Sequence, residues 1–110
     1  MYTIENQSFF CPTEITLHVL NDKWKLFIMY TLLDGPKRFK EICETFPNIT
    51  QKTISIKLKE LENAHMINRM VFAEVPPKVE YSLSEIGKKS EPMLKSIYEF
   101  GLIYASMYAK

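Results

Sequence analysis

The stretch ITQKTISIKLKELENAHMINR, residues 49–69, predicts a helix with a single apolar stripe. Thr50 is a suitable N-cap, because its hydroxyl can accept a hydrogen bond from a free N–H group of the first turn. The helix is therefore expected over residues 50–63, with Gln51 as its first helical residue. Its apolar residues are spaced by four and three positions, which places them on the side that faces the core. They are Ile54, Leu58 and Leu61.

The opposite side of this helix, here called the outer face, carries hydrogen-bond donors and positive charge. It consists of Gln51, Lys52, Thr53, Ser55, Ile56 and Lys59, with Lys57 at its flank. In a DNA major groove, an aliphatic Ile56 can contact a thymine methyl group while Lys52 and Ser55 reach base edges or phosphates. The ordinary alternative is that lysine and glutamine on an outer face only keep the helix in solution. The residues that follow favour the first interpretation.

Residues 67–83 predict two short strands around a proline-rich turn. NRMVFAEV and KVEYSL flank the turn VPPK, and Val79, Tyr81 and Leu83 alternate with polar residues, so the second strand is expected to bury one face. Lys78 at the tip is a candidate phosphate contact, although such a tip alone is more often an ordinary turn. A surface helix followed by this hairpin is the plan of a winged helix, in which the helix enters a DNA groove.

Two helices are expected near the N-terminus. Pro12 suits the first position of a helix that runs to about Leu20. Asp22 can cap a second helix, which Asp34, Gly35 and Pro36 stop. The helical period in the second helix is carried by Trp24, Phe27, Ile28, Thr31 and Leu32. Trp24 is therefore expected in the core.

A third short helix is expected from Arg38 to Phe46. Its apolar positions, which are expected to be buried, are Phe39, Ile42, Cys43 and Phe46. Lys37 and Arg38 lie at its start, where they are candidates for holding DNA phosphates together with the free N–H groups of the helix. The alternative for both residues is a solvated helix start.

The order and spacing of several motifs resemble the HxlR-type transcriptional regulators, a branch of the winged helix-turn-helix proteins related to MarR. These motifs are Cys11–Pro12, KWK at 23–25, GPKRF at 35–39, ITQK at 49–52 and VPPKVEYSL at 75–83. The resemblance implies an α+β, mainly helical fold: a winged helix-turn-helix with N- and C-terminal dimerisation helices. It also implies a homodimer that binds palindromic operator DNA and often controls nearby genes in answer to chemical stress.

Composition is compatible with this interpretation. A chain of 110 residues, of which 46% are hydrophobic and 25% charged, is expected to form one globular domain over residues 1–110. The net charge is only +1, but residues 36–59 alone carry six basic and two acidic residues, so positive charge gathers on the predicted helix-turn-helix. No apolar run approaches the ~20 residues needed to span a bilayer, and no secretory signal opens the chain. A cytoplasmic location without membrane contact is expected.

The C-terminal segment predicts a dimerisation helix over residues 91–109. Pro92 must either kink a helix or begin a new one. The helix carries more apolar surface than the core of one small domain absorbs, which favours a homodimer in which the N-terminal helix shares the contact. The predicted interface residues are Met93, Ile97, Phe100, Tyr104, Met107 and Tyr108. The alternative is simple packing of the last helix on its own core.

Cys11 is the candidate for chemistry beyond DNA binding. It precedes Pro12 at a helix start, where the positive end of the helix dipole favours the reactive thiolate. The resemblance implies a role in sensing electrophiles or disulfide stress, so Cys11 is a redox-sensing candidate whose oxidation would change operator affinity. The alternative is a small core or capping residue. Cys43 is a weaker candidate, because it falls at the core period of its helix.

Nothing in the sequence predicts an enzyme, a metal site or a cofactor. His18 and His65 lack metal-ligand partners at short spacing, and the three glycines form no phosphate-binding loop. Two other classes of function stay open. One is a winged-helix protein–protein interaction module without DNA binding. The other is a small-molecule effector site between the dimer helix and the DNA-binding part, where plain core packing is the alternative for the lining aromatics Phe27, Tyr30, Phe100 and Tyr104.

Overall fold

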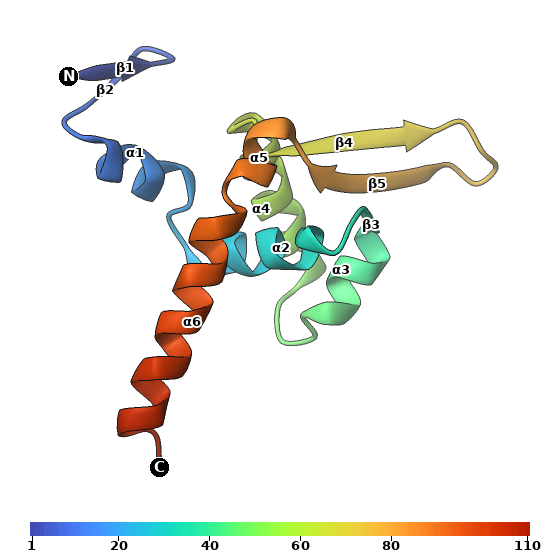
Figure 1. Cartoon of the computed structure of the whole chain (residues 1–110). Helices are drawn as coiled ribbons and strands as arrows, with labels where there is room; N and C mark the ends of the chain where they lie inside the picture. The colour runs from blue at the N-terminus through green and yellow to red at the C-terminus, as the bar shows by residue number, and fades with distance from the viewer.

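The computed structural model describes all residues, 1–110, as six helices with a small sheet and a separate N-terminal hairpin (Figure 1). The helices are α1 (Pro12–Val19), α2 (Lys23–Leu33), α3 (Phe39–Thr45), α4 (Gln51–Asn63), α5 (Glu85–Lys89) and α6 (Glu91–Tyr108). The strands are β1 (Tyr2–Ile4), β2 (Gln7–Phe9), β3 (Lys37–Arg38), β4 (Ile67–Phe72) and β5 (Lys78–Leu83). The fold is α+β and mainly helical, with the α3–turn–α4 unit followed directly by the β4–β5 wing.

Helix starts follow the capping residues of the sequence. Asp22 Oδ1 accepts a hydrogen bond of 2.9 Å from the Lys25 N–H, and Thr50 Oγ1 accepts one of 3.1 Å from the Thr53 N–H. Each bond satisfies a free donor of the first turn, so α2 and α4 begin directly after the cap. Pro92 lies in the first turn of α6, which confirms that it begins a new helix rather than kinking an old one.

The core forms where α2, α3 and α4 meet the base of the wing. The predicted stripe of α4 is confirmed, because Ile54, Leu58 and Leu61 are fully buried. The prediction for α2 is partly wrong: Trp24 is half-buried and Phe27 is exposed. These two rings instead pack edge to face, 5.5 Å apart, beside the ring of Phe46. The core side of α2 is formed by Lys25, Ile28, Met29 and Leu32.

The sheet corrects two further predictions. β5 lies between β3 and β4, with Lys37 opposite Tyr81 and Arg38 opposite Glu80, so residues 37–38 form a short strand, and Arg38 is at the same time the N-cap of α3. The third helix consequently begins at Phe39. Every residue of β5 from 78 to 82 is half-buried, so the expected alternation of a buried and an exposed face is absent. The pairing of β3 with β5 joins sites that lie 44 residues apart, which local patterns do not report.

An N-terminal β-hairpin precedes α1. Glu5 and Asn6 occupy its turn with φ of +47° and +67°, the left-handed region that a tight two-residue hairpin requires. Phe9 is buried, and Glu5 Oε1 lies 2.7 Å from His65 Nε2 at the corner between α4 and β4. Helix α1 itself buries no residue within the protomer.

Helix α6 extends from the body of the protein, and the C-terminus lies at its far end (Figure 1). Near its start Leu94 is fully buried, and Met93 packs against the core. All residues from Lys95 to the C-terminus are exposed. The structure contains no helix that combines the length and the apolar character needed to cross a membrane.

Candidate nucleic-acid interface

The outer face of α4 is directed to solvent. Burial of the opposite stripe against α2 determines this orientation, since the two sides of a helix cannot both face the core. Ile56 retains 47% exposure, which leaves an aliphatic group free beside donors and positive charge. The exposed members are Gln51, Lys52, Ser55, Ile56 and Lys59, and Thr53 is half-buried. The structure therefore brings together all the outer-face candidates on one accessible surface.

Lys57, at the flank of this surface, is held by an ion pair. Its Nζ lies 2.8 Å from Asp22 Oδ2 and 3.7 Å from Glu60 Oε1. The hydrogen bond to Asp22 raises the pKa of Lys57, against the opposing effect of burial and with the help of the negative charges of Asp22 and Glu60. Its charge is thus compensated within the protein.

Lys37 and Arg38 approach the interface from strand β3. Lys37 is half-buried and Arg38 is exposed. The backbone N–H of Arg38 donates a hydrogen bond of 2.9 Å to Glu41 Oε1, so the expected free N–H group at this position is already satisfied. The exposed side chain of Arg38 can reach a phosphate, and the contribution expected from the free N–H groups of the helix stays a prediction.

Lys78 occupies the first position of β5 rather than the tip of the wing. Its Nζ lies 3.1 Å from Glu80 Oε2 and 4.8 Å from the centre of the Phe72 ring. The wing tip carries no basic residue: Glu74 is exposed, and Val75 is fully exposed before Pro76 and Pro77. A free lysine at the tip is therefore not observed, and the assignment of Lys78 as a phosphate contact stays a prediction.

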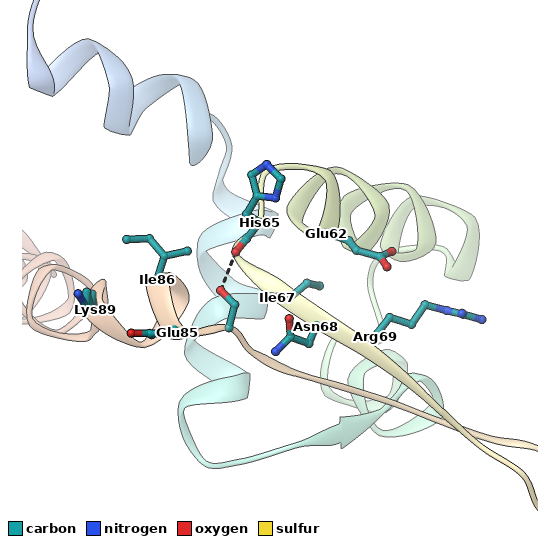
Figure 2. A pocket seen from close by; sticks show the side chains of 9 residues that line it. Glu62, His65, Ile67, Asn68, Arg69, Glu85, Ile86 and Lys89 are labelled. Atoms are coloured by element: carbon teal, nitrogen blue, oxygen red, sulfur yellow. Dashed lines mark hydrogen bonds between the residues drawn. The ribbon is translucent and has the colours of Figure 1, made fainter. Parts of the chain in front are cut away.

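Arg69 is a cationic residue that the sequence patterns did not single out. It is exposed on β4, directly after Asn68. In the sequence it is the only charged residue of this strand, so no cluster of charge indicates it. It lines an open groove of about 690 Å³ between the end of α4, β4 and α5, and Figure 2 shows its side chain directed away from Glu85 and Lys89. Acidic and basic side chains both line this groove: Glu62, His65, Arg69, Glu85 and Lys89.

The same view explains how the wing is attached to the body. Ser84 Oγ donates a hydrogen bond of 2.6 Å to the His65 carbonyl, drawn as a dashed line in Figure 2, and accepts one of 3.0 Å from the Gly87 N–H. The Ser84 N–H donates to the Met66 carbonyl at 3.1 Å. One serine therefore caps α5 and joins the α4–β4 corner to the end of the wing.

The two cysteines occupy different environments. Cys11 is half-buried at the N-cap of α1, and its carbonyl accepts a hydrogen bond of 3.1 Å from the Glu14 N–H. Cys43 packs against the core, where burial and, to a smaller extent, the charge of Glu44 raise the pKa of its thiol. A raised pKa lowers the thiolate fraction, so Cys43 is the less reactive candidate.

The C-terminal helix presents an unusually large apolar surface. Of the predicted interface residues, Met93 is directed to the protomer's own core, while the others are exposed: Ile97, Phe100, Tyr104, Met107 and Tyr108. Tyr98, Leu102 and Ile103 are also exposed, so apolar groups surround the helix. The aromatic pocket considered from the sequence is not observed within the protomer, because Phe27 stacks on Phe46 and Tyr30 packs on Tyr98.

Comparison with known proteins agrees with this architecture. The family model described as HxlR-like helix-turn-helix matches residues 19–108. The HTH-type transcriptional regulator YdeP of Bacillus subtilis is 45% identical over 94 residues, which cover 86% of this chain and 73% of YdeP.

Solved structures show the same relationship. The redox regulator HypR in its reduced form has a TM-score of 0.83 and 40% identity, covering 89% of this chain and 100% of HypR. Its oxidised form has a TM-score of 0.79 and 45% identity, covering 83% of this chain and 94% of HypR. A MarR-family regulator from Porphyromonas gingivalis has a TM-score of 0.79 and 30% identity, covering 93% of this chain and 96% of that protein.

The family model matches nearly the whole chain. The structure agrees with this match, because a helix with an exposed polar face is followed directly by a wing. The chain therefore belongs to the HxlR-like helix-turn-helix family and is a transcriptional regulator of the helix-turn-helix type.

Proposed function

We propose that this protein binds double-stranded DNA as a homodimer and places the outer face of α4 in the major groove. The observation that carries the proposal is the solvent-directed outer face, on which Lys52, Ser55 and Ile56 are all exposed. Lysine and serine supply donors for base edges and phosphates, and the isoleucine supplies an apolar contact for a thymine methyl group. Lys37 and Arg38 on β3 add phosphate contacts, and Lys78 joins them when it exchanges Glu80 for a phosphate.

The dimer follows from the surface of α6. Phe100 is 65% exposed within the protomer, and burying such a ring contributes roughly 1.5–3 kcal/mol. Several side chains of this size lie along α6, and α1, none of whose residues is fully buried in its own protomer, adds to the contact. A two-fold dimer presents two α4 helices to half-sites about one turn of DNA apart, roughly 34 Å, which fits a palindromic operator.

A mobility-shift assay on the DNA upstream of the protein's own gene tests the DNA-binding proposal. Affinity is expected to fall steeply as salt rises, because lysine and arginine release counterions from the phosphates. Lys52→Ala is expected to weaken operator binding about tenfold and to alter sequence preference, whereas Lys95→Ala, an exposed lysine on α6, leaves binding unchanged. Folded protein that shifts no DNA at any salt would favour the protein–protein interaction module.

Light scattering at micromolar concentration tests the dimer. Wild-type protein and Lys95→Ala are expected to be dimers, while Phe100→Glu, which places a charge in the apolar contact, is expected to be a monomer. A monomeric wild-type protein would overturn both the dimer and the palindromic operator.

We further propose that Cys11 makes DNA binding responsive to oxidants. Cys11 lies at the N-terminus of α1, a helix proposed to share in the dimer contact, and HypR, which this chain resembles over most of its length, is a redox regulator. Oxidant is expected to change the operator affinity of the wild-type protein and of Cys43→Ser, but not that of Cys11→Ser. If oxidant changes the operator affinity of Cys11→Ser as much as that of the wild-type protein, Cys11 is not the sensing residue.

A further inference from the structure

Four charged side chains join the start of α2 to the flank of α4. Lys25 Nζ lies 3.0 Å from Asn21 Oδ1 and 3.2 Å from Glu60 Oε1, and Lys57 Nζ lies 2.8 Å from Asp22 Oδ2 and 3.7 Å from Glu60 Oε1. Asp22, Lys25, Lys57 and Glu60 are here called the charge clamp. Asn21 and Asp22 belong to the short segment between α1 and α2, so the clamp connects this segment to the proposed recognition helix.

The four side chains differ in burial, and Lys25 is the most deeply buried of them. The side chains of Lys25, Lys57, Asp22 and Glu60 are 8%, 22%, 26% and 45% exposed, respectively. A buried ammonium group such as that of Lys25 is costly to desolvate unless hydrogen-bond acceptors surround it. Glu60 and Asn21 supply such acceptors. The clamp contains two positive and two negative side chains, so it adds no net charge to the surrounding surface.

Asp22 is constrained from two directions. Its Oδ1 accepts from the Lys25 N–H as the N-cap of α2, while its Oδ2 accepts from Lys57 Nζ. Both carboxylate oxygens are thus occupied, by α2 and by α4. A displacement of α4 relative to α2 must therefore break either the ion pair or the cap.

The position of the clamp on α4 determines what it can control. At about 100° per residue, Lys57 and Glu60 lie on one flank of the helix, between the buried stripe and the outer face. The apolar stripe holds α4 against α2, but hydrophobic contacts are non-directional and tolerate a rotation of the helix about its axis. Ion pairs of defined geometry on one flank resist that rotation.

We propose that Asp22, Lys25, Lys57 and Glu60 are positioning residues that fix the rotation of α4, and with it the direction in which the outer face meets DNA. The inference rests on the proposed function, since it concerns how well the proposed recognition helix discriminates sequences. It assigns Lys57 to the interior of the regulator rather than to a DNA phosphate.

Asp22→Asn is the most selective perturbation. Asparagine is as good an N-cap as aspartate, so α2 keeps its start while Lys57 loses the nearer of its two counter-charges, at 2.8 Å, and keeps Glu60 at 3.7 Å. Asp22→Asn and Lys57→Met are each expected to weaken operator binding at least tenfold and to leave binding to unrelated DNA within about twofold of wild type. The double variant is expected to be no weaker than either single variant, because both remove the same contact. Lys57→Arg is expected to retain most of the operator affinity, and Lys95→Met, which breaks an exposed pair with Glu91, serves as the control.

Two results would overturn the proposal. If Lys57 contacts a phosphate, Lys57→Met weakens all DNA sequences alike and reduces the salt slope by about one, while Asp22→Asn frees the lysine and strengthens binding. Unchanged operator discrimination in both single variants contradicts the clamp as well.

Hydrogen exchange without DNA separates this inference from the proposed function. In Asp22→Asn, the α4 amides that follow Lys57 are expected to exchange at least tenfold faster relative to those of the α6 start around Leu94. Unchanged exchange in α4 overturns the clamp whether or not the protein binds DNA. Accelerated exchange in a protein that shifts no DNA supports the clamp and removes the proposed function alone.

Discussion

Replacing Gly87 by alanine is expected to destabilise the fold, although alanine is the better helix former. A Cβ at this position would lie 2.1 Å from the carbonyl oxygen of Met66 and 3.2 Å from its carbonyl carbon. Ordinary contacts begin near 3.4 Å, so α5 and the α4–β4 corner must separate by about 1 Å. Gly87 is therefore required for the close approach of two backbones.

The cost combines overpacking with damaged hydrogen bonds. Overpacking a well-fitted site costs about 1–3 kcal/mol, and the separation also strains the bond of 3.1 Å from the Ser84 N–H to the Met66 carbonyl, worth about 1 kcal/mol. The free energy of unfolding is expected to fall by roughly 2–4 kcal/mol. For a domain of this size, that lowers Tm by about 10–25 °C.

Thermal unfolding followed by circular dichroism measures this loss. Lys88→Ala is the matched control, because it places alanine in the same short helix at an exposed position, and it is expected to change stability by less than about 0.5 kcal/mol. A Gly87→Ala variant as stable as Lys88→Ala would refute the close approach of α5 to Met66.

Three further predictions concern the caps, the core and the ion pair. Thr50→Ala removes the N-cap of α4 and is expected to lower the free energy of unfolding by about 1 kcal/mol, measured by denaturant titration. Leu94→Ala, at the buried start of α6, is expected to cost about 2–5 kcal/mol, with Tm as the readout. Burial opposes ionisation of Asp22, but the hydrogen bonds from Lys57 and from the Lys25 N–H outweigh it and hold its pKa below the usual 3.8. Because the folded state holds this proton more weakly than the unfolded state, the stabilisation is present above about pH 4 and is lost as the pH falls through the lower folded pKa.

Each of these predictions has a result that contradicts it. Thr50→Ser keeps a hydroxyl cap and should retain wild-type stability, so an equal loss in both variants would exclude capping as the cause. A Leu94→Ala variant with unchanged Tm would mean that α6 is not anchored by this side chain. For the acid dependence, denaturant titrations of Asp22→Asn should lack the part of the loss that Asp22 contributes. Identical slopes for the variant and the wild type below about pH 4 would contradict the linkage.

Local patterns were sufficient for the elements whose ends depend on a few neighbouring residues. The start of α4 at Gln51 follows from the Thr50 cap, and its buried stripe follows from the helical period of Ile54, Leu58 and Leu61. Pro92 narrowed the last segment to a kinked helix or a new helix, and the structure shows the new helix α6. These features involve hydrogen bonds and side-chain spacing within one turn or two, which a sequence displays directly. The expected outer face of α4 could be named for the same reason.

Local patterns do not predict contacts between segments that lie far apart in the sequence. The pairing of Arg38 with Glu80, 42 residues later in the chain, adds strand β3 directly before α3, and no local pattern indicates it. Trp24 lies at the edge of the core and not inside it, because α2 directs its Lys25 side toward α4.

Sequence alone determined which residues form the outer face of α4, because the helical period assigns every side chain of one helix to a side. Only the tertiary structure decided which of the nearby charges are still available to a partner. A lysine such as Lys57 has the same local sequence signature whether it is free or paired, and its state depends on Asp22, a carboxylate 35 residues away along the chain that folding brings within 2.8 Å.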